Sequence, residues 1–142
     1  METEKLIEAA LAMRGYAYTP YSHFQVGAAL LTEDGEIYTG CNIENAGYTP
    51  SNCAERTAIF KAVSEGKYRF RAIAVAGGPE GSRELPYCPP CGVCRQVIRE
   101  FCGDDFPVIL ARSPQDYRVL TLGELFPESF GPEDLEEKNA ES

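Results

Sequence analysis

Apolar residues recur along this chain at two spacings, one typical of amphipathic helices and one typical of buried strands. Helical spacing predicts three helices, over residues 2–14, 53–65 and 91–102. Gly15 and Gly66 stand directly after the first two of these segments, where glycine commonly ends a helix. Shorter apolar runs bounded by turn residues predict strands over residues 26–31, 36–41, 72–76 and 108–111, with a last strand over residues 119–122.

The order of these segments predicts an α/β fold. Residues 21–42 bring two strands together as a hairpin, because Asp34-Gly35 is a common hairpin turn. Further along, strands alternate with helices, which indicates crossover connections and a sheet covered by helices on both faces. We predict a loop over residues 77–89, and a turn or short helix over residues 130–135.

The length and charge of the chain limit its organisation and partners. Its 142 residues suit one domain, which we expect over residues 1–135, followed by an acidic, disordered tail over residues 136–142. A net charge of −9 opposes approach to a phosphate backbone, so we expect no nucleic-acid partner. The apolar runs are strand-sized and nothing at the start resembles a signal peptide, so we expect no membrane partner and a cytoplasmic location.

Three of the six cysteines have the spacing of a zinc site. Cys91 and Cys94 lie three residues apart at the start of a predicted helix, which places both thiols on one turn. Cys53 opens another predicted helix and adds a third thiolate, which leaves the fourth tetrahedral position of zinc open for water. Glu55 follows two residues after Cys53, so its carboxyl group can stand beside the metal without binding it. This arrangement is typical of a catalytic zinc site with a proton shuttle.

The assignment of the paired ligands depends on Cys88, which lies three residues before Cys91. Pro89 and Pro90 hold the residues before them extended and cannot lie inside a helix, so we expect Cys88 to lie upstream and Cys91 and Cys94 to bind zinc. The alternative is a closed structural site with Cys88 or Cys41 as a fourth sulfur ligand. Cys102 and Cys41 are predicted to pack as small apolar residues. His23, the one histidine, has no partner at metal-ligand spacing and is predicted to have a packing or surface role.

Five sequence blocks extend over nearly the whole chain: residues 20–29, 40–46, 53–59, 90–97 and 129–135. These blocks resemble the small homotetrameric cytidine deaminases. The resemblance implies a three-layer α/β/α cytidine-deaminase-like fold with a mixed, roughly five-stranded sheet. It implies one zinc ion per subunit and active sites shared within a homotetramer. It also implies hydrolytic deamination of cytidine and deoxycytidine in pyrimidine salvage. Residues 77–89 differ from the usual loop of this family.

Three charged residues have predicted roles in the reaction. Glu55 would accept a proton from the water that attacks C4 of the pyrimidine, protonate N3 and pass a proton to the departing ammonia. Arg56 and Arg95 follow the ligands closely enough to hydrogen-bond the thiolates and to offset their negative charge. The resemblance implies this charge-moderating role for Arg56.

The remaining predicted site residues would bind the nucleoside. Asn42 and Glu44 alternate along a strand end, so both can face two sugar hydroxyls, and the resemblance implies that they hold the ribose. A carboxylate there would repel the 5′-phosphate of a nucleotide. Phe24 is a candidate for stacking on the base, and Phe130 resembles the aromatic residue that the family sends into a neighbouring subunit's site. The other predicted substrate contacts are Ala54 and the segment Ala46, Gly47 and Tyr48, which resembles an intersubunit contact region.

Other function classes make different demands on the sequence. A zinc-stabilised binding module would need a fourth permanent ligand, and a polynucleotide editor would need a basic groove that an acidic chain lacks. Within the deaminases, an enzyme for a related cytosine nucleoside or a nucleoside antibiotic is the alternative.

Overall fold

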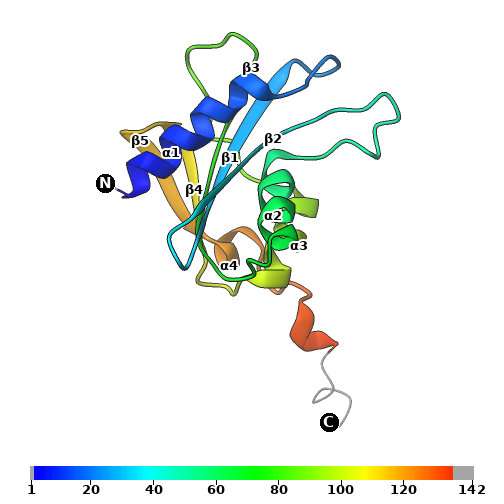
Figure 1. The fold of residues 1–142 in the computed structure, drawn as a ribbon, viewed down its shortest axis with the longest axis vertical. Helices are drawn as coiled ribbons and strands as arrows, with labels where there is room; N and C mark the ends of the chain where they lie inside the picture. The colour runs from blue at the N-terminus through cyan, green and yellow to red at the C-terminus, as the bar shows by residue number, and fades with distance from the viewer. Residues whose placement is uncertain (1, 136–142) are drawn as a thin grey trace.

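A mixed five-stranded sheet forms the centre of the computed structural model, which describes residues 2–135 (Figure 1). The strand order is β2-β1-β3-β4-β5. β1 (Phe24–Thr32) pairs antiparallel with β2 (Ile37–Cys41) and with β3 (Phe70–Pro79). β3 pairs parallel with β4 (Pro107–Ser113), and β4 pairs antiparallel with β5 (Asp116–Thr121). The mixed five-stranded sheet predicted from the sequence is confirmed.

Helices cover both faces of this sheet. α1 (Glu2–Met13), which continues as the 3₁₀ helix η1 (Arg14–Tyr16), lies on one face. α2 (Ala54–Ser64) and α3 (Gly92–Phe101) lie on the other face (Figure 1). A short helix α4 (Leu122–Leu125) and a 3₁₀ turn η2 (Pro132–Asp134) follow the last strand. The arrangement is the predicted three-layer α/β/α fold.

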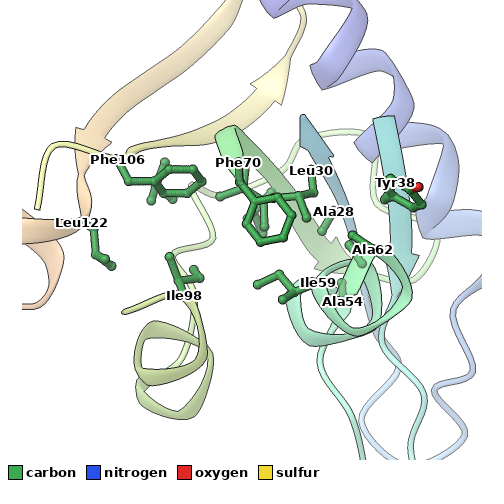
Figure 2. Close-up of a cluster of buried hydrophobic side chains, with 14 of the residues drawn as sticks. Ala28, Leu30, Tyr38, Ala54, Ile59, Ala62, Phe70, Ile98, Phe106 and Leu122 are labelled. Atoms are coloured by element: carbon green, nitrogen blue, oxygen red, sulfur yellow. The ribbon is translucent and has the colours of Figure 1, made fainter. Parts of the chain in front are cut away.

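Alternation along the strands separates two apolar cores. Leu30 points toward α2 and packs in one core with Ile59 and Ile98 (Figure 2). Ile73 belongs to the same core. Leu31 belongs to the opposite core, under Ile7 of α1. Because successive strand residues face opposite sides, each central strand contributes to both layers. Burying each of these large aliphatic side chains is worth about 1.5–3 kcal/mol, so the two cores hold the helices at fixed positions on the sheet.

Two glycines allow the helices to approach the strands closely. A Cβ atom on Gly27 of β1 would lie 1.9 Å from the carbonyl oxygen of Ala10 in α1. A Cβ atom on Gly40 of β2 would lie 2.5 Å from the carbonyl oxygen of Ala54. The second contact places the start of α2 directly against the end of β2, so residues that follow β2 lie beside residues that open α2.

Several element boundaries differ from the prediction, and three of these differences change the connections between elements. β3 continues through Pro79, so residues 77–79, predicted as loop, extend the sheet by pairing with the first residues of β1. β1 begins at Phe24, so residues 21–23 precede the hairpin. The last strand begins at Asp116, and Leu122 opens α4 behind a capping box formed by Thr121 and Glu124.

The site lies at one end of the strands, where β1 starts and where β2 and β3 end. Phe24 pairs with Pro79, and Gly27 pairs with Cys41. The predicted tail, residues 136–142, lies outside the described residues. Among the helices of residues 2–135, none has the length and apolar character needed to cross a membrane.

Candidate active site

Three cysteine thiols come together where two helices begin. Cys53 is the N-cap residue of α2 and Cys91 the N-cap residue of α3, both with extended backbone, and Cys94 lies in the first turn of α3. The three Sγ atoms lie within 4.8 Å of one another, and those of Cys53 and Cys91 are 3.6 Å apart. Within residues 2–135 this is the one such group of His, Cys, Asp and Glu side chains that could hold a metal ion. Its members are the three predicted ligands, without Cys88.

The spacing of the thiols fits zinc. A tetrahedral zinc ion with bonds of about 2.3 Å holds its sulfur ligands about 3.8 Å apart. The distance between the Cys53 and Cys91 sulfurs is close to this value. Both N-cap positions also place thiols at the positive ends of helices, which favours thiolates. Three protein ligands in a tetrahedral set leave one position for water.

Positive charge and hydrogen bonding favour the thiolate of Cys53. A hydrogen bond from the Cys94 thiol is the largest cause that lowers the pKa of Cys53 to about 5, and Arg56 contributes a further hydrogen bond. Arg56 donates from Nη2 to Cys53 Sγ over 3.3 Å. The hydrogen bond to Cys53 and burial raise the pKa of Cys94. Arg56 Nε is the buried side-chain polar atom that lacks a hydrogen-bond partner within the described part of the chain. An unpaired buried donor beside the sulfurs fits a site that carries additional negative charge.

Glu55 is the one buried carboxyl group between residues 2 and 135, with 3% of its surface exposed. It lies in the first turn of α2, next to the N-cap Cys53. Burial is the largest cause that raises the pKa of Glu55 to about 7, and the negative charge of Cys53 raises it further. A carboxyl group that titrates near neutral pH can both accept and donate a proton, as a general acid–base requires.

Cys88 lies beside this cluster but outside it. A Cβ atom on Gly77 would lie 2.9 Å from Cys88 Sγ, so this thiol packs over the end of β3. Burial is the largest cause that raises the pKa of Cys88 to about 11. The two other cysteines are also apart from the thiol cluster, and burial raises the pKa of Cys41 and, to about 12, that of Cys102. Cys41 and Cys102 have the environment of packed apolar residues.

The side chains of Asn42 and Glu44 bind the backbone near the start of β1. Asn42 accepts from the Val26 amide over 2.9 Å and donates to the Phe24 carbonyl over 2.8 Å. Glu44 accepts from the amides of Tyr21 and Ser22 over 3.0 and 3.1 Å, and from the Ser22 hydroxyl. The Ser22 hydroxyl is the largest cause that lowers the pKa of Glu44. Amide and carboxylate oxygens can accept a second hydrogen bond, so both side chains keep capacity for a ligand.

The other predicted substrate residues lie in different environments. Ala54 is buried at the start of α2, and Phe24 is half-buried where β1 begins. Ala46, Gly47 and Tyr48 are exposed in the loop after β2, and 75% of the Tyr48 surface is accessible. Phe130 is 56% exposed. These exposed residues contribute little to the closure of the site within one chain.

Arg95 has other partners than the predicted thiolates. It donates from Nε to the Pro90 carbonyl over 2.8 Å and from Nη1 to the Leu125 carbonyl. These bonds connect the residue before Cys91 to the end of α4. Arg95 therefore holds the backbone at the start of α3, whereas Arg56 is the arginine that contacts a sulfur.

Comparison with known proteins agrees with this geometry. A family model described as "cytidine and deoxycytidylate deaminase zinc-binding region" matches residues 1–110. The chain belongs to this deaminase family. It is 53% identical to a cytidine deaminase of Sporosarcina psychrophila over 135 residues, which cover 95% of this chain and 96% of that protein. It is 49% identical to the cytidine deaminase of Halalkalibacterium halodurans, over 95% of this chain and 98% of the relative.

Solved structures of the family share the fold. A cytidine deaminase from Burkholderia pseudomallei has a TM-score of 0.79 and 48% identity, over 89% of this chain and 97% of that chain. A cytidine deaminase from Mycobacterium tuberculosis has a TM-score of 0.78 and 37% identity, over 93% of this chain and 99% of that chain. As a member of the zinc-binding deaminase family, the chain is a hydrolytic deaminase with zinc as its cofactor.

Sequence analysis of this deaminase missed the residues that hold Glu44. Tyr21 and Ser22 donate three hydrogen bonds to its carboxylate. The available signal was Pro20-Tyr21-Ser22 ahead of a strand, since serine and proline commonly form turns whose amides and hydroxyls bind nearby polar groups. The partner that such a turn contacts is determined by the packing of the β2 end against it.

Proposed function

We propose that this chain is a cytidine deaminase that converts cytidine and deoxycytidine, with water, to uridine and deoxyuridine plus ammonia. The observation that carries the proposal is a set of three clustered thiols with a buried carboxyl group, Glu55, in the first helical turn after one of them. When bound by Cys53, Cys91 and Cys94, zinc supplies a water of lowered pKa at its fourth position.

Glu55 would move the protons of this reaction. Its carboxylate accepts a proton from the attacking water, its carboxyl form protonates N3 of the pyrimidine, and a further transfer to the amino group releases ammonia. The pKa of about 7 supports both protonation states near neutral pH. Arg56, which donates to Cys53 Sγ, would reduce the negative charge of the thiolates and so favour a nucleophilic water.

Asn42 and Glu44 would bind the ribose hydroxyls at the sheet edge. Their side chains are already oriented by the backbone of residues 21–26, which lowers the entropy cost of binding a sugar. Phe24 would stack on the base, and Ala54 would line the same pocket. The carboxylate of Glu44 disfavours a 5′-phosphate, so nucleosides would be preferred over nucleotides.

A homotetramer with shared active sites would complete the pocket. The thiol of Cys91 is exposed, and so are Tyr48 and Phe130. A neighbouring subunit that contributes Phe130 and the Ala46, Gly47 and Tyr48 segment would cover this open side. The enzyme would serve pyrimidine salvage in the cytoplasm.

The deciding experiment follows ultraviolet absorbance and ammonia while zinc-loaded protein is incubated with nucleosides. Cytidine and deoxycytidine should yield equal amounts of uracil nucleoside and ammonia, whereas dCMP and single-stranded DNA should react far more slowly. If zinc is bound but neither nucleoside is consumed, the proposal is wrong. If dCMP or a cytosine nucleoside antibiotic reacts faster than cytidine, the preferred substrate is a nucleotide or such an antibiotic instead.

A further inference from the structure

The segment of residues 83–90, in the connection from β3 to α3, is held by side chains instead of backbone pairing. Among the described residues, no backbone amide from residue 83 to residue 91 donates to a backbone carbonyl. A segment without such bonds keeps one position only if other contacts hold it. Cys91 follows this segment directly, so the position of one candidate zinc ligand depends on those contacts.

Leu85 forms the first contact. It is buried in the core beneath α1, and a Cβ atom on Gly78 would lie 2.7 Å from Leu85 Cδ2. The carbonyl of Leu85 also accepts from Arg112 Nε over 2.6 Å. The first half of the segment is therefore attached both to the α1 side of the sheet and to β4.

Tyr87 forms the second contact. Its ring lies 5.4 Å from Arg112 Cζ and 5.5 Å from Arg118 Cζ, within the range of cation–π attraction. Its hydroxyl donates to Asp116 Oδ1 over 2.7 Å, and Asp116 pairs with Arg112 over 3.3 Å. We refer to Tyr87, Arg112, Asp116 and Arg118 as the Tyr87 clamp. The three partners of Tyr87 belong to the antiparallel β4–β5 hairpin, whose register shifts between Ala111 and Ser113, at Arg112.

Two prolines connect the clamp to the thiols. Only Cys88, Pro89 and Pro90 separate Tyr87 from Cys91, and each proline ring fixes its own φ and restricts the preceding residue. Pro90 is fully buried, and its carbonyl accepts from Arg95. A displacement of Tyr87 is therefore passed along a stiff connection to Cys91, because few backbone rotations remain to absorb it.

We propose that Tyr87 is a positioning residue for the zinc site: the clamp fixes the approach of residues 88–91 and thereby the placement of the Cys91 thiol relative to Cys53 and Glu55. The kinetic consequence rests on the proposed cytidine deaminase function, whereas the consequence for metal binding does not.

The experiment compares three clamp variants with a matched control. Tyr87→Leu removes the ring and the hydroxyl, Tyr87→Phe removes only the hydroxyl, and Arg118→Gln removes one cation. Tyr117→Leu is the control, because it makes the same substitution in β5 at a tyrosine whose side chain is not part of the clamp. Zinc transfer to a chromophoric chelator, the thiolate-to-metal absorption of the cobalt-substituted protein, kcat and KM are measured, together with the thermal midpoint.

Tyr87→Leu should release zinc about 10–100-fold faster than Tyr117→Leu, as expected when support of a metal ligand is lost. It should also shift the cobalt bands and lower kcat more than it changes KM. Tyr87→Phe and Arg118→Gln should show smaller changes in the same direction. If Tyr87→Leu fails to fold, these two variants decide.

The positioning role is wrong if the folded clamp variants match Tyr117→Leu in zinc release and cobalt absorption. It is also wrong if all four variants change these properties in proportion to their thermal midpoints. If the unmodified protein binds zinc but releases no ammonia from cytidine, the proposed function fails, and the two metal measurements still test the clamp.

Discussion

The candidate site has a metal end, formed by the thiols and Glu55, and an exposed end, formed by residues that one chain leaves open to solvent. At the metal end, three thiols lie within 4.8 Å of one another and Glu55 is 3% exposed. At the exposed end, the residues proposed to enter a neighbouring subunit's site, Tyr48 and Phe130, are 75% and 56% exposed. The metal end is formed by helix N-termini packed on the sheet, whereas the exposed end consists of a loop and a terminal segment. In this fold the groups that carry the chemistry and the groups that would cover the pocket therefore come from different kinds of structure.

Substitution of the thiols should have the largest effect, because it removes the metal end. Cys53→Ala, Cys91→Ala and Cys94→Ala should each lose most of the bound zinc and all measurable deaminase activity. Cys88→Ala should retain zinc, because its thiol packs over Gly77 outside the cluster. Zinc content measured by atomic spectroscopy on purified protein checks both parts. Retention of zinc by Cys94→Ala and its loss from Cys88→Ala would reverse the ligand assignment.

Glu55→Gln should come next, because it keeps the shape of the metal end and removes its proton carrier. We expect a loss of at least about 10²–10⁴ in kcat, since general acid–base catalysis contributes that much and Glu55 would serve several transfers. Zinc content and the circular dichroism spectrum should not change. Steady-state kinetics on zinc-loaded protein measures the effect. Near-normal turnover of this variant would assign the proton transfers to another group.

Phe130→Ala tests the exposed end and should have an intermediate effect. If Phe130 stacks in a neighbouring subunit's site, kcat/KM should fall about 5–150-fold, equivalent to the 1–3 kcal/mol of a base–aromatic contact. Zinc content should stay at one ion per chain. Tyr68→Ala is the control, because Tyr68 is 58% exposed and lies after α2, away from both ends. Full activity from a monomer of the unmodified protein in sedimentation would contradict the shared site.

Ser22→Ala should have the smallest effect, at Glu44, which lines the same pocket as Tyr48. The Ser22 hydroxyl is the largest cause of the lowered pKa of Glu44, so its removal should move that pKa toward the ordinary value of 4.5. Because the pKa of Glu44 is lowered in the folded state, its carboxylate stabilises the fold at pH values above its ordinary pKa. This stabilisation is lost as the pH falls through the folded-state pKa. Nuclear magnetic resonance titration of the Glu44 carboxyl group measures the shift. Ser51→Ala, in the loop that follows Glu44, should leave the pKa of Glu44 unchanged.

The two halves of the metal end were each predictable because the geometry within each half is local, whereas the contact between Cys53 and Cys91 joins residues that are 38 positions apart. The spacing of Cys91 and Cys94 places both thiols on one helical turn, and Pro89 and Pro90 exclude Cys88 from that turn. Glu55 lies beside Cys53 for the same reason, since both open α2. The alternation of strands and helices along the chain similarly predicted a sheet covered by helices on both faces. Each of these features depends on residues that are near one another in the chain.

The tertiary structure decided the features that join distant segments. Arg56 and Arg95 both lie within the first turns of helices that begin at thiols. Arg56 nevertheless donates to a sulfur, whereas Arg95 donates to the Leu125 carbonyl. Residues 77 and 78 became strand because β1 was available to pair with them. The sequence by itself determined which side chains share a turn, a strand face or a helix end. Which remote backbone or side chain each would meet depended on the packing of several elements, because such contacts form only when the layers assemble.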